Sequence, residues 1–300
     1  YDTLMGVLHQ TSPDLNWTIK FFNALIISLG LLFFYLFAKE FIGDGRKALL
    51  ATFFLAMIPS YLSHFIWAHS YVVTLFFPAM YALQMIKKDS KWIWISLIIV
   101  ASIWVTQNIE QPIKLTVLML LFILVASIVR KQFLKKEFAA ICGGILLSLV
   151  WWGTMVWKYG IKGMLQYYTS ERIIASTGSS AVSSTTSFFS DFGSKIYEIW
   201  RSITSPGGSG SRAYSFDDFF YAKSANMINN PIGIGVVLSL LVLVGLVWML
   251  WKYRKSLTSQ DENVWVCVVL FWFVYTFWGV NGQTFPFSIA RWPFRIWMLL

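Results

Sequence analysis

Long apolar runs alternate with short charged segments along most of this chain. Nine such runs cover residues 17–37, 48–65, 71–86, 92–106, 113–129, 138–157, 231–251, 264–280 and 285–300. An α-helix needs roughly 20 apolar residues to cross the core of a bilayer, and several of the runs reach this length. The pattern therefore predicts an all-α fold, a polytopic bundle of transmembrane helices.

One long polar stretch, residues 158–230, interrupts the series of apolar runs. Helical periodicity over residues 192–203, and less regularly over 158–174, predicts short helices lying in the membrane interface. A Ser/Thr/Gly-rich run separates these two segments. We expect three parts: transmembrane helices 1–6 in residues 1–157, a lid-like loop in 158–230, and transmembrane helices 7–9 in 231–300, the last one cut at Leu300.

The composition excludes a water-soluble domain, because 57% of the residues are hydrophobic and only 13% are charged. The net charge of +10 does not indicate a nucleic-acid partner, since the basic residues sit in short clusters between apolar runs. If the loops alternate from an outer N-terminus, thirteen of the 24 basic residues fall in four inner loops. These are Lys39, Arg46, Lys47, Lys87, Lys88, Lys91, Arg130, Lys131, Lys135, Lys136, Lys252, Arg254 and Lys255.

The three short outer links, near residues 64–70, 107–112 and 281–284, hold no basic residue. The positive-inside rule then makes the four basic loops cytoplasmic. It predicts a multi-pass protein of the cell membrane in which residues 158–230 are extracytoplasmic.

Polar candidates for chemistry collect at the predicted outer ends of the spans. Glu110 lies in Thr106-Gln-Asn-Ile-Glu-Gln-Pro-Ile-Lys114, where a carboxylate, carboxamides and a lysine border the membrane. Ionisable groups next to a span indicate function, and the alternative is a solvated loop with one glutamate. His69 follows His64 by five residues, a spacing that does not put both on one helical face, so His69 is better placed to line a polar site than to share a metal with His64.

Arg291 and Arg295 are four residues apart at the start of the last run, which places both on one face of a helix. Two guanidinium groups just inside the outer boundary suit a phosphate or diphosphate; the alternative is snorkelling to the lipid headgroups. The pairs Glu171–Arg172 and Asp217–Asp218 in the polar stretch are weaker candidates. No P-loop, GxSxG, HExxH or CxxC arrangement is present, so ATP hydrolysis and serine hydrolysis have no support.

Several segments resemble the GT-C superfamily of membrane glycosyltransferases, which use lipid-phosphate sugar donors. These are residues 16–25, 43–51 and 56–63, together with the long external loop and the outer arginines. The chain is most similar to the catalytic subunit of archaeal oligosaccharyltransferases. The resemblance implies that the family's first acidic motif lies upstream of Tyr1 and that a C-terminal soluble domain is missing, so the chain looks like a piece of a longer polypeptide.

The resemblance also implies roles for individual residues. Residues 158–230 would close over donor and acceptor, Arg291 or Arg295 would engage the lipid phosphate, and His69 occupies the place of the family's second acidic motif. Glu171 and Arg172 would belong to the lid. Beyond the resemblance, Glu110 is the catalytic candidate: an acidic residue upstream of Tyr1, aided by Glu110, would bind a divalent metal, Mg²⁺ or Mn²⁺, or activate the acceptor, with Glu110 or His69 as the metal ligand in this chain.

The expected function is transfer of a sugar or oligosaccharide from a polyprenyl-(pyro)phosphate carrier, such as a dolichyl phosphate, to a protein or glycan acceptor at the outer face. Transfer of a single sugar, as in protein mannosyltransferases or arabinosyltransferases, is an alternative within the same class. A polytopic transporter or lipid flippase is the alternative from another class, although no repeat relates the two halves of the chain. A structural subunit of a larger membrane complex is the third.

Overall fold

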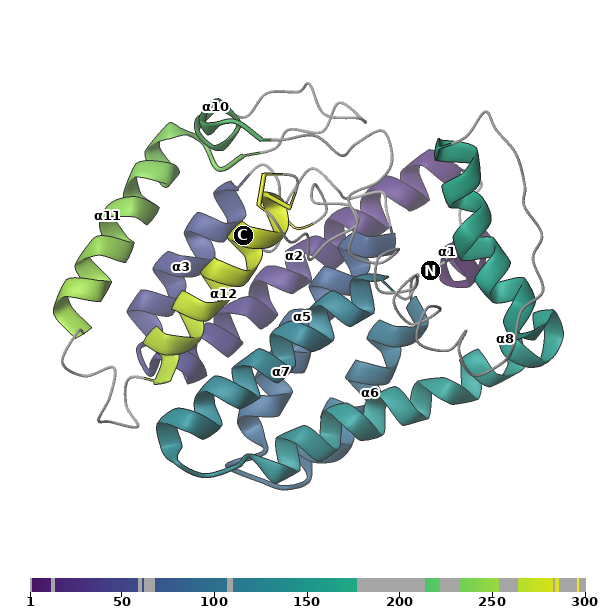
Figure 1. Ribbon diagram of the computed structural model, residues 1–300, viewed down its shortest axis with the longest axis horizontal. Helices are drawn as coiled ribbons and strands as arrows, with labels where there is room; N and C mark the ends of the chain where they lie inside the picture. Colours follow the sequence, from purple (N-terminus) through teal and green to yellow (C-terminus); the bar gives the residue numbers. More distant parts are fainter. Residues whose placement is uncertain are drawn as a thin grey trace.

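The protein is all-α in the computed structural model, which describes residues 2–11, 14–58, 61, 68–106, 110–176, 214–221, 233–253, 264–282, 284–285 and 296 (Figure 1). Its helices are α1 (Asp2–His9), α2 (Leu15–Ile42), α3 (Gly45–Met57), α5 (Ala68–Met85), α6 (Trp92–Thr106), α7 (Glu110–Arg130), α8 (Lys135–Ser176), α10 (Phe216–Phe220), α11 (Val236–Tyr253) and α12 (Val264–Val280). Eight of them coincide with the first eight predicted runs, which confirms the all-α prediction.

Four helical segments in the described part are long and apolar enough to cross a membrane. They are Asn16–Ile42, Gln111–Arg130, Lys135–Gly160 and Val236–Tyr253. Shorter apolar helices, Tyr71–Met85, Trp92–Thr106 and Val264–Val280, pack among them. Their length and composition indicate a multi-pass membrane protein. Large apolar side chains on the outside of the bundle, such as Val150 and Val237, which are 73% and 70% exposed, agree with a lipid-facing surface.

Three of the basic loops meet at one end of the bundle. Lys88 in the α5–α6 loop pairs with Glu40 near the end of α2. On its other side, Ser90 of the same loop accepts a hydrogen bond of 2.8 Å from Lys136 at the start of α8. The ends of α2, α5 and α7 and the starts of α3, α6 and α8 therefore lie together, as Figure 1 shows. We call this the inner end, following the orientation predicted from charge, and the opposite end the outer end.

A two-residue turn joins α2 to α3 at the inner end. Gly43 ends α2 in the left-handed conformation (φ 76°), which glycine adopts without a steric penalty, and its N–H donates to the Lys39 carbonyl at 2.9 Å. Asp44 then begins α3, because its carboxylate accepts from the N–H groups of Arg46 at 2.9 Å and Lys47 at 3.3 Å. The N–H of Lys47, followed by that of Arg46, lowers the pKa of the Asp44 carboxyl below its ordinary value.

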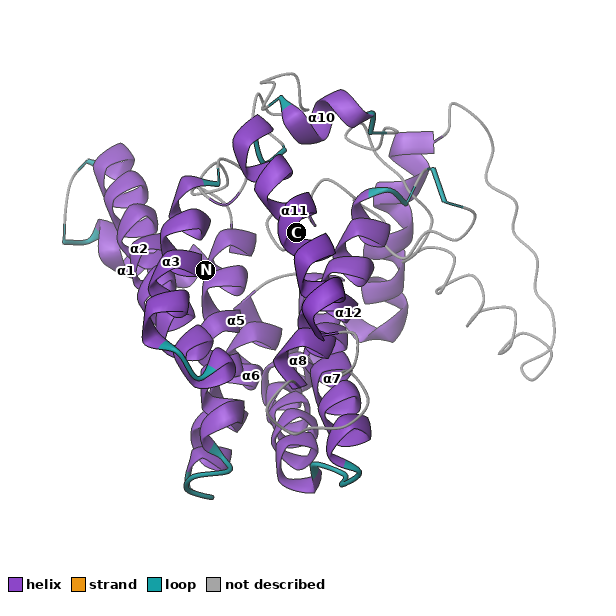
Figure 2. Cartoon of the chain, turned by 90° about the vertical axis from the view of Figure 1, so that its left-hand side faces the viewer, coloured by secondary structure: helices purple, strands orange, loops and turns teal. Residues whose placement is uncertain are grey.

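Helix α5 is the centre of the core. Val72, Val73, Thr74 and Ala82 are buried and point in four directions around the helix axis, so side chains are covered on every face of this helix. It packs against α2, α6 and α7. Figure 2 shows the surrounding helices running roughly side by side. This helix therefore fixes the relative positions of α2, α6 and α7, and α7 in turn packs against α12.

Helix α8 packs closely against α6 through two adjacent glycines. A Cβ atom on Gly144 would lie 2.6 Å from the Val100 Cβ and 2.8 Å from the Leu97 carbonyl oxygen. On Gly143 it would meet only the end of the Leu97 side chain, at 2.9 Å. This close approach of backbones is the usual way in which membrane helices gain van der Waals contact when lipid removes the hydrophobic driving force.

Two helix ends differ from the predicted runs. Helix α3 stops at Met57 rather than at residue 65, because Ile58 precedes a proline and takes extended backbone angles (φ −76°, ψ 115°). Helix α8 continues past the predicted boundary at residue 157 and reaches Ser176, with a kink at Gly160 (φ 68°, ψ 157°). The less regular helical pattern over residues 158–174 therefore belongs to a helix, and the predicted lid-like loop begins inside it. The second predicted lid helix, residues 192–203, lies outside the described part.

Candidate functional site

The outer end of α7 carries two buried polar side chains. Helix α7 begins at Glu110, and Pro112 fits its first turn because the first N–H groups of a helix have no partner within it. Gln111 is 2% exposed and Lys114 is 4% exposed. The Gln111 Nε2 has no hydrogen-bond partner among the described residues. A buried amide donor without a described partner, next to a buried cation at a membrane boundary, makes this end of α7 a candidate site for an oxygen-rich group.

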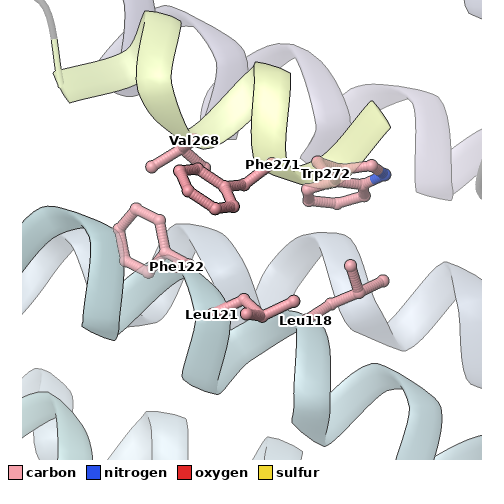
Figure 3. Close-up of a pocket in the computed structure, with 6 residues that line it drawn as sticks. All are labelled: Leu118, Leu121, Phe122, Val268, Phe271 and Trp272. Atoms are coloured by element: carbon pink, nitrogen blue, oxygen red, sulfur yellow. The ribbon is translucent and has the colours of Figure 1, made fainter. Parts of the chain in front are cut away.

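Helix α12 faces the side of α7 that carries Lys114. Figure 3 shows Leu118, Leu121 and Phe122 of α7 opposite Val268, Phe271 and Trp272 of α12. Lys114 precedes Leu118 by four residues and Leu121 by seven, so it lies on the same face of α7, one turn nearer the outer end. On the antiparallel α12, the fully buried Thr276 is one turn beyond Trp272. The helical register therefore directs Lys114 toward the outer end of α12.

Below Lys114 this contact between α7 and α12 is tight. The six apolar side chains of Figure 3 enclose a cavity of only about 10 Å³. That volume is at the lower limit for a single water molecule, and its apolar lining offers no hydrogen bonds. On the inner side of Lys114, this contact leaves no room between the two helices for a larger group.

Hydrogen bonds of two tryptophans hold the outer ends of α6, α7 and α8 together. The Trp104 indole N–H of α6 donates to the Thr116 hydroxyl of α7 at 3.0 Å. The Trp152 indole of α8 donates to the Trp104 carbonyl at 3.1 Å. These bonds satisfy polar groups that would otherwise be exposed to hydrocarbon, and they fix the turn of α7 that carries Lys114.

A large apolar groove lies on the other side of α12, between the α2–α3 pair and α11. Its volume is about 470 Å³, within the range of roughly 300–1,000 Å³ that is usual for ligand sites. Phe37, Phe41, Phe54 and Trp265 are among the aromatic rings that line it, and Tyr61 supplies a hydroxyl. Among the described residues, no charged side chain lines the groove. Its lining suits a hydrocarbon chain and disfavours a charged ligand.

Helix α11 closes this groove loosely. Gly245 and Met249 face the groove, whereas Val244 and Trp251 on the other side are 65% and 66% exposed. A Cβ atom on Gly245 would meet no described atom within 4 Å, so there is open space next to this glycine. In Figure 1, α11 stands apart from α3 at one side of the bundle. The groove is therefore accessible from the bilayer rather than from water.

Trp272 connects the groove with the buried lysine. Its side chain lines the groove and also packs on Leu118 in the α7–α12 contact. Lys114 is four residues before Leu118, which corresponds to about 6 Å along the helix. A ligand with an apolar chain in the groove and an anionic head displaced outward by one helical turn would match this arrangement.

Tyr61 lies where the groove approaches the middle of the bundle. Its hydroxyl donates to the Ile27 carbonyl of α2 at 3.2 Å. A Cβ atom on Gly30 would lie 2.7 Å from this hydroxyl and 3.0 Å from a methyl of Thr74. Gly30 is therefore required for α2 to pass over Tyr61 and α5 at this distance. Because its hydroxyl is bonded to the backbone of α2, Tyr61 is held in place as part of the groove's wall.

A described piece of the predicted lid, Tyr214–Tyr221, is anchored on the outer ends of α11 and α12. The Phe219 carbonyl accepts from the Ile234 N–H and the Ser239 hydroxyl, both at 3.1 Å. Its ring contacts that of Phe277 in α12, with centroids 5.6 Å apart. At the start of α10, Asp218 accepts from the N–H of Ser215 at 2.8 Å. Asp218 thus has a structural role as a helix cap.

The predicted site residues lie in or near this outer region only in part. Glu110 is the first residue of α7 and His69 the second of α5, while Glu171 and Arg172 lie in the last turns of α8. The side chains of these four residues lie outside the described part, as do Arg291 and Arg295 entirely. The one described residue in that last stretch is Ile296, which is 1% exposed and packs on Gly279 of α12.

The described residues do not provide a metal centre. Within them, no group of three or more His, Cys, Asp or Glu side chains could hold a metal ion. The predicted ligands Glu110 and His69 are not among the side chains searched. A divalent cation prefers several oxygen ligands, and the described outer end of α7 offers a carboxamide and a cation instead.

Sequence reasoning placed Lys114 in a polar segment but did not identify it as a buried group, and it missed the groove. The signal for Lys114 was its spacing of four and seven residues from leucines of the same helix. The groove had no signal, since its walls come from segments more than 200 residues apart.

No protein-family model matches this chain, and no curated protein and no solved structure matches it.

Proposed function

We propose that this protein is a membrane transferase that binds a lipid-linked sugar and transfers the sugar to an acceptor at its outer face. The observation that carries the proposal is the pairing of an apolar groove with buried Lys114 one helical turn further out. A polyprenyl-(pyro)phosphate carrier has the same two parts, a long hydrocarbon chain and an anionic head. The resemblance of the sequence to GT-C glycosyltransferases supports the transfer of a sugar rather than of another group.

Lys114 would hold the phosphate that leaves in this reaction. As the bond between the sugar C1 and the phosphate oxygen breaks, negative charge grows on that oxygen, and a fixed ammonium group stabilises it. The stabilisation is stronger in a site shielded from water than at the surface. The buried Gln111 amide, which has an unused donor among the described residues, would bind a second phosphate oxygen.

Glu110 would act as the general base. Positions 110 and 114 are four apart in α7, so the backbone puts both on one face of the helix at its outer end. The acceptor heteroatom would attack C1 while its proton passes to the Glu110 carboxylate and the lipid phosphate departs with the bonding electrons. Arg291 and Arg295 would assist in binding the phosphate, and His69, Glu171 and Arg172 would contact substrate from the outer link and the lid.

The test is sugar transfer in proteoliposomes from a radiolabelled polyprenyl-phosphate sugar to peptide and glycan acceptors. Lys114→Gln should lower kcat/KM by about 10²–10³-fold, the usual effect of removing a group that stabilises the developing charge. Lys114→Arg should retain more activity than Lys114→Gln, because it keeps the charge. Activity unchanged in both variants would refute the phosphate role.

The groove is tested by a matched pair of substitutions. Gly245→Phe puts a ring into the open space of the groove, whereas Gly153→Phe puts the same ring on the exposed side of α8, where a Cβ atom also meets nothing within 4 Å. We expect Gly245→Phe to raise the KM for the lipid donor at least tenfold and Gly153→Phe to leave it unchanged. Equal effects of the two variants would mean that the groove does not hold the donor.

A lipid transporter is the second candidate, and one observation favours it. The groove extends to Trp265 and Phe41, near the inner ends of α12 and α2, and is open to the bilayer beside α11. A carrier moved between leaflets would need such a path. Fluorescent polyprenyl phosphate in proteoliposomes separates the two functions: movement between leaflets without sugar transfer would establish the transporter, and transfer without movement the enzyme.

A further inference from the structure

A second apolar groove, distinct from the one assigned to the sugar donor, lies between α7 and α8. Its volume is about 340 Å³, and its lining consists of α7 side chains from Val117 to Leu124 together with Phe133 and Phe138. Leu124 and Phe133 are 53% and 52% exposed, so the groove is open to the surroundings of the bundle. In a membrane the surroundings at this depth are the acyl chains of lipids.

The inner end of this groove is bordered by cations. The segment from Arg130 to Glu137 contains four basic side chains, Arg130, Lys131, Lys135 and Lys136, against the single carboxylate of Glu137. Lys131 and Lys135 are exposed, whereas Glu137 is only 5% exposed. The rings of Phe133 and Phe138 lie next to each other in a tilted arrangement, with centroids 5.6 Å apart. The groove therefore has an apolar body and a positively charged mouth.

The loop that carries the charges is held in one shape. Ser127 accepts two hydrogen bonds from it, at its carbonyl from the Gln132 N–H (3.1 Å) and at its hydroxyl from the Leu134 N–H (3.2 Å). Lys131 adopts a positive φ of 51°, a conformation that residues with a Cβ atom rarely take. A loop fixed in this way presents its ammonium groups at a defined position relative to the groove.

We propose that this groove is a binding site for an anionic phospholipid of the inner leaflet. One acyl chain would lie along α7 between Val117 and Leu124, and the phosphate headgroup would contact Lys131 and Lys135. The charge of the mouth selects an anionic over a zwitterionic headgroup, because each lysine near such a headgroup contributes about a fivefold factor in affinity. The acyl chain positions the lipid through its fit to the groove but adds little affinity, since hydrocarbon gains little by leaving one apolar surface for another.

The experiment is native mass spectrometry of the purified full chain, titrated with phosphatidylglycerol or with phosphatidylcholine of the same acyl chains. We expect tighter binding of phosphatidylglycerol. Lys131→Gln/Lys135→Gln should weaken it about 25-fold, from two fivefold factors. The matched control, Arg46→Gln/Lys47→Gln, removes the same charge from the α2–α3 turn, which contributes no residue to the lining of this groove, and should change the affinity by less than about twofold.

A second pair of variants tests the groove itself. Leu124→Trp fills it, and Leu50→Trp puts the same ring on the exposed side of α3, at a leucine that is 55% exposed and lines neither groove. Leu124→Trp should weaken phosphatidylglycerol binding at least fivefold and Leu50→Trp should not. If Leu124→Trp does not fold, as judged by its Tm in detergent, Leu124→Phe takes its place.

Three results would overturn the proposal. Equal binding of the two lipids would indicate ordinary lipid around the bundle. Equal losses of phosphatidylglycerol affinity in Lys131→Gln/Lys135→Gln and in Arg46→Gln/Lys47→Gln would indicate general attraction to a basic surface. Unchanged binding in the Leu124 variants would show that the groove takes no part. Because sugar transfer is not the readout, the outcome is independent of the proposed function.

Discussion

Replacing Gly144 by alanine should separate α6 from α8. The new Cβ atom would lie 2.6 Å from the Val100 Cβ, about 1 Å inside the usual carbon–carbon distance of roughly 3.5–4.0 Å. Neither the Val100 Cβ nor the Leu97 carbonyl oxygen, at 2.8 Å, can rotate away, because both are fixed to the backbone of α6. The helices themselves therefore have to move apart, and they carry Trp104 and Trp152, whose hydrogen bonds fix the outer end of the bundle.

Two opposing effects set the magnitude of this change. Overpacking in a well-packed interior costs typically about 1–3 kcal/mol, and a backbone clash belongs at the upper end of this range. Alanine is favoured over glycine inside a helix by roughly 0.5–1 kcal/mol. The clash outweighs the helix preference, so we expect Gly144→Ala to lower the free energy of unfolding by about 2 kcal/mol.

The assay is thermal unfolding of the purified protein in one detergent, read by tryptophan fluorescence. At about 2 °C for each kcal/mol, Gly144→Ala should lower the apparent Tm by about 4 °C. The two controls are on the same helix. Gly143→Ala meets only the mobile end of Leu97 and should shift the Tm by less than half as much, and Gly153→Ala meets nothing within 4 Å and should not lower it. Equal shifts in all three variants would refute the close approach at Gly144.

Further predictions concern the lid anchor, the inner turn and the outer hydrogen bonds. Gly233→Ala should expose the α10 segment to protease, because its Cβ atom would clash with the Asp218 carbonyl oxygen. Gly235→Ala is the control and should expose the segment less, because Gly235 has a similar positive φ (85°, compared with 92° at Gly233) but open space around it. The Asp44 carboxylate should stabilise the fold fully above its ordinary pKa of 3.8 and lose this contribution as the pH falls through its lowered pKa. The Tm difference between wild type and Asp44→Ala should therefore shrink as the pH falls through that lowered pKa. Trp104→Phe removes the indole N–H donor to α7 and should cost about 1 kcal/mol in unfolding experiments; no change would mean that water replaces the bond.

Most helices of this protein are predictable because each apolar run is long relative to a soluble helix and is bounded by charges. The errors fall where a local backbone preference competes with the apolar pattern. Ile58 is apolar, but the proline after it ends α3, and polar residues 158–176 continue α8 because nothing there except Gly160 interrupts a helix. Hydropathy reports the surroundings of a residue and not its backbone angles, so it places spans better than it places their ends.

The candidate site was harder to predict for another reason. In a soluble helix, the contrast between an apolar and a polar face shows which residues are buried. Helix α7 is apolar on nearly all sides, so its sequence does not show that the face with Lys114 is a buried one. The helix that packs on the same face of α7, α12, is about 150 residues further along the chain. The apolar groove depends in the same way on α2, α3, α11 and α12 meeting around one space.

Under the proposed function, selection of a lipid has to come from the polar end of the ligand. A hydrocarbon chain that moves from the bilayer into the groove exchanges one apolar environment for another and gains little free energy. The groove therefore admits a chain but does not distinguish carriers by it. At Lys114 the balance is different, because a buried ammonium group attracts a phosphate more strongly than one in water does. The difference follows from the solvent: in hydrocarbon, the shape of a site positions a ligand, and its charge determines which ligand binds.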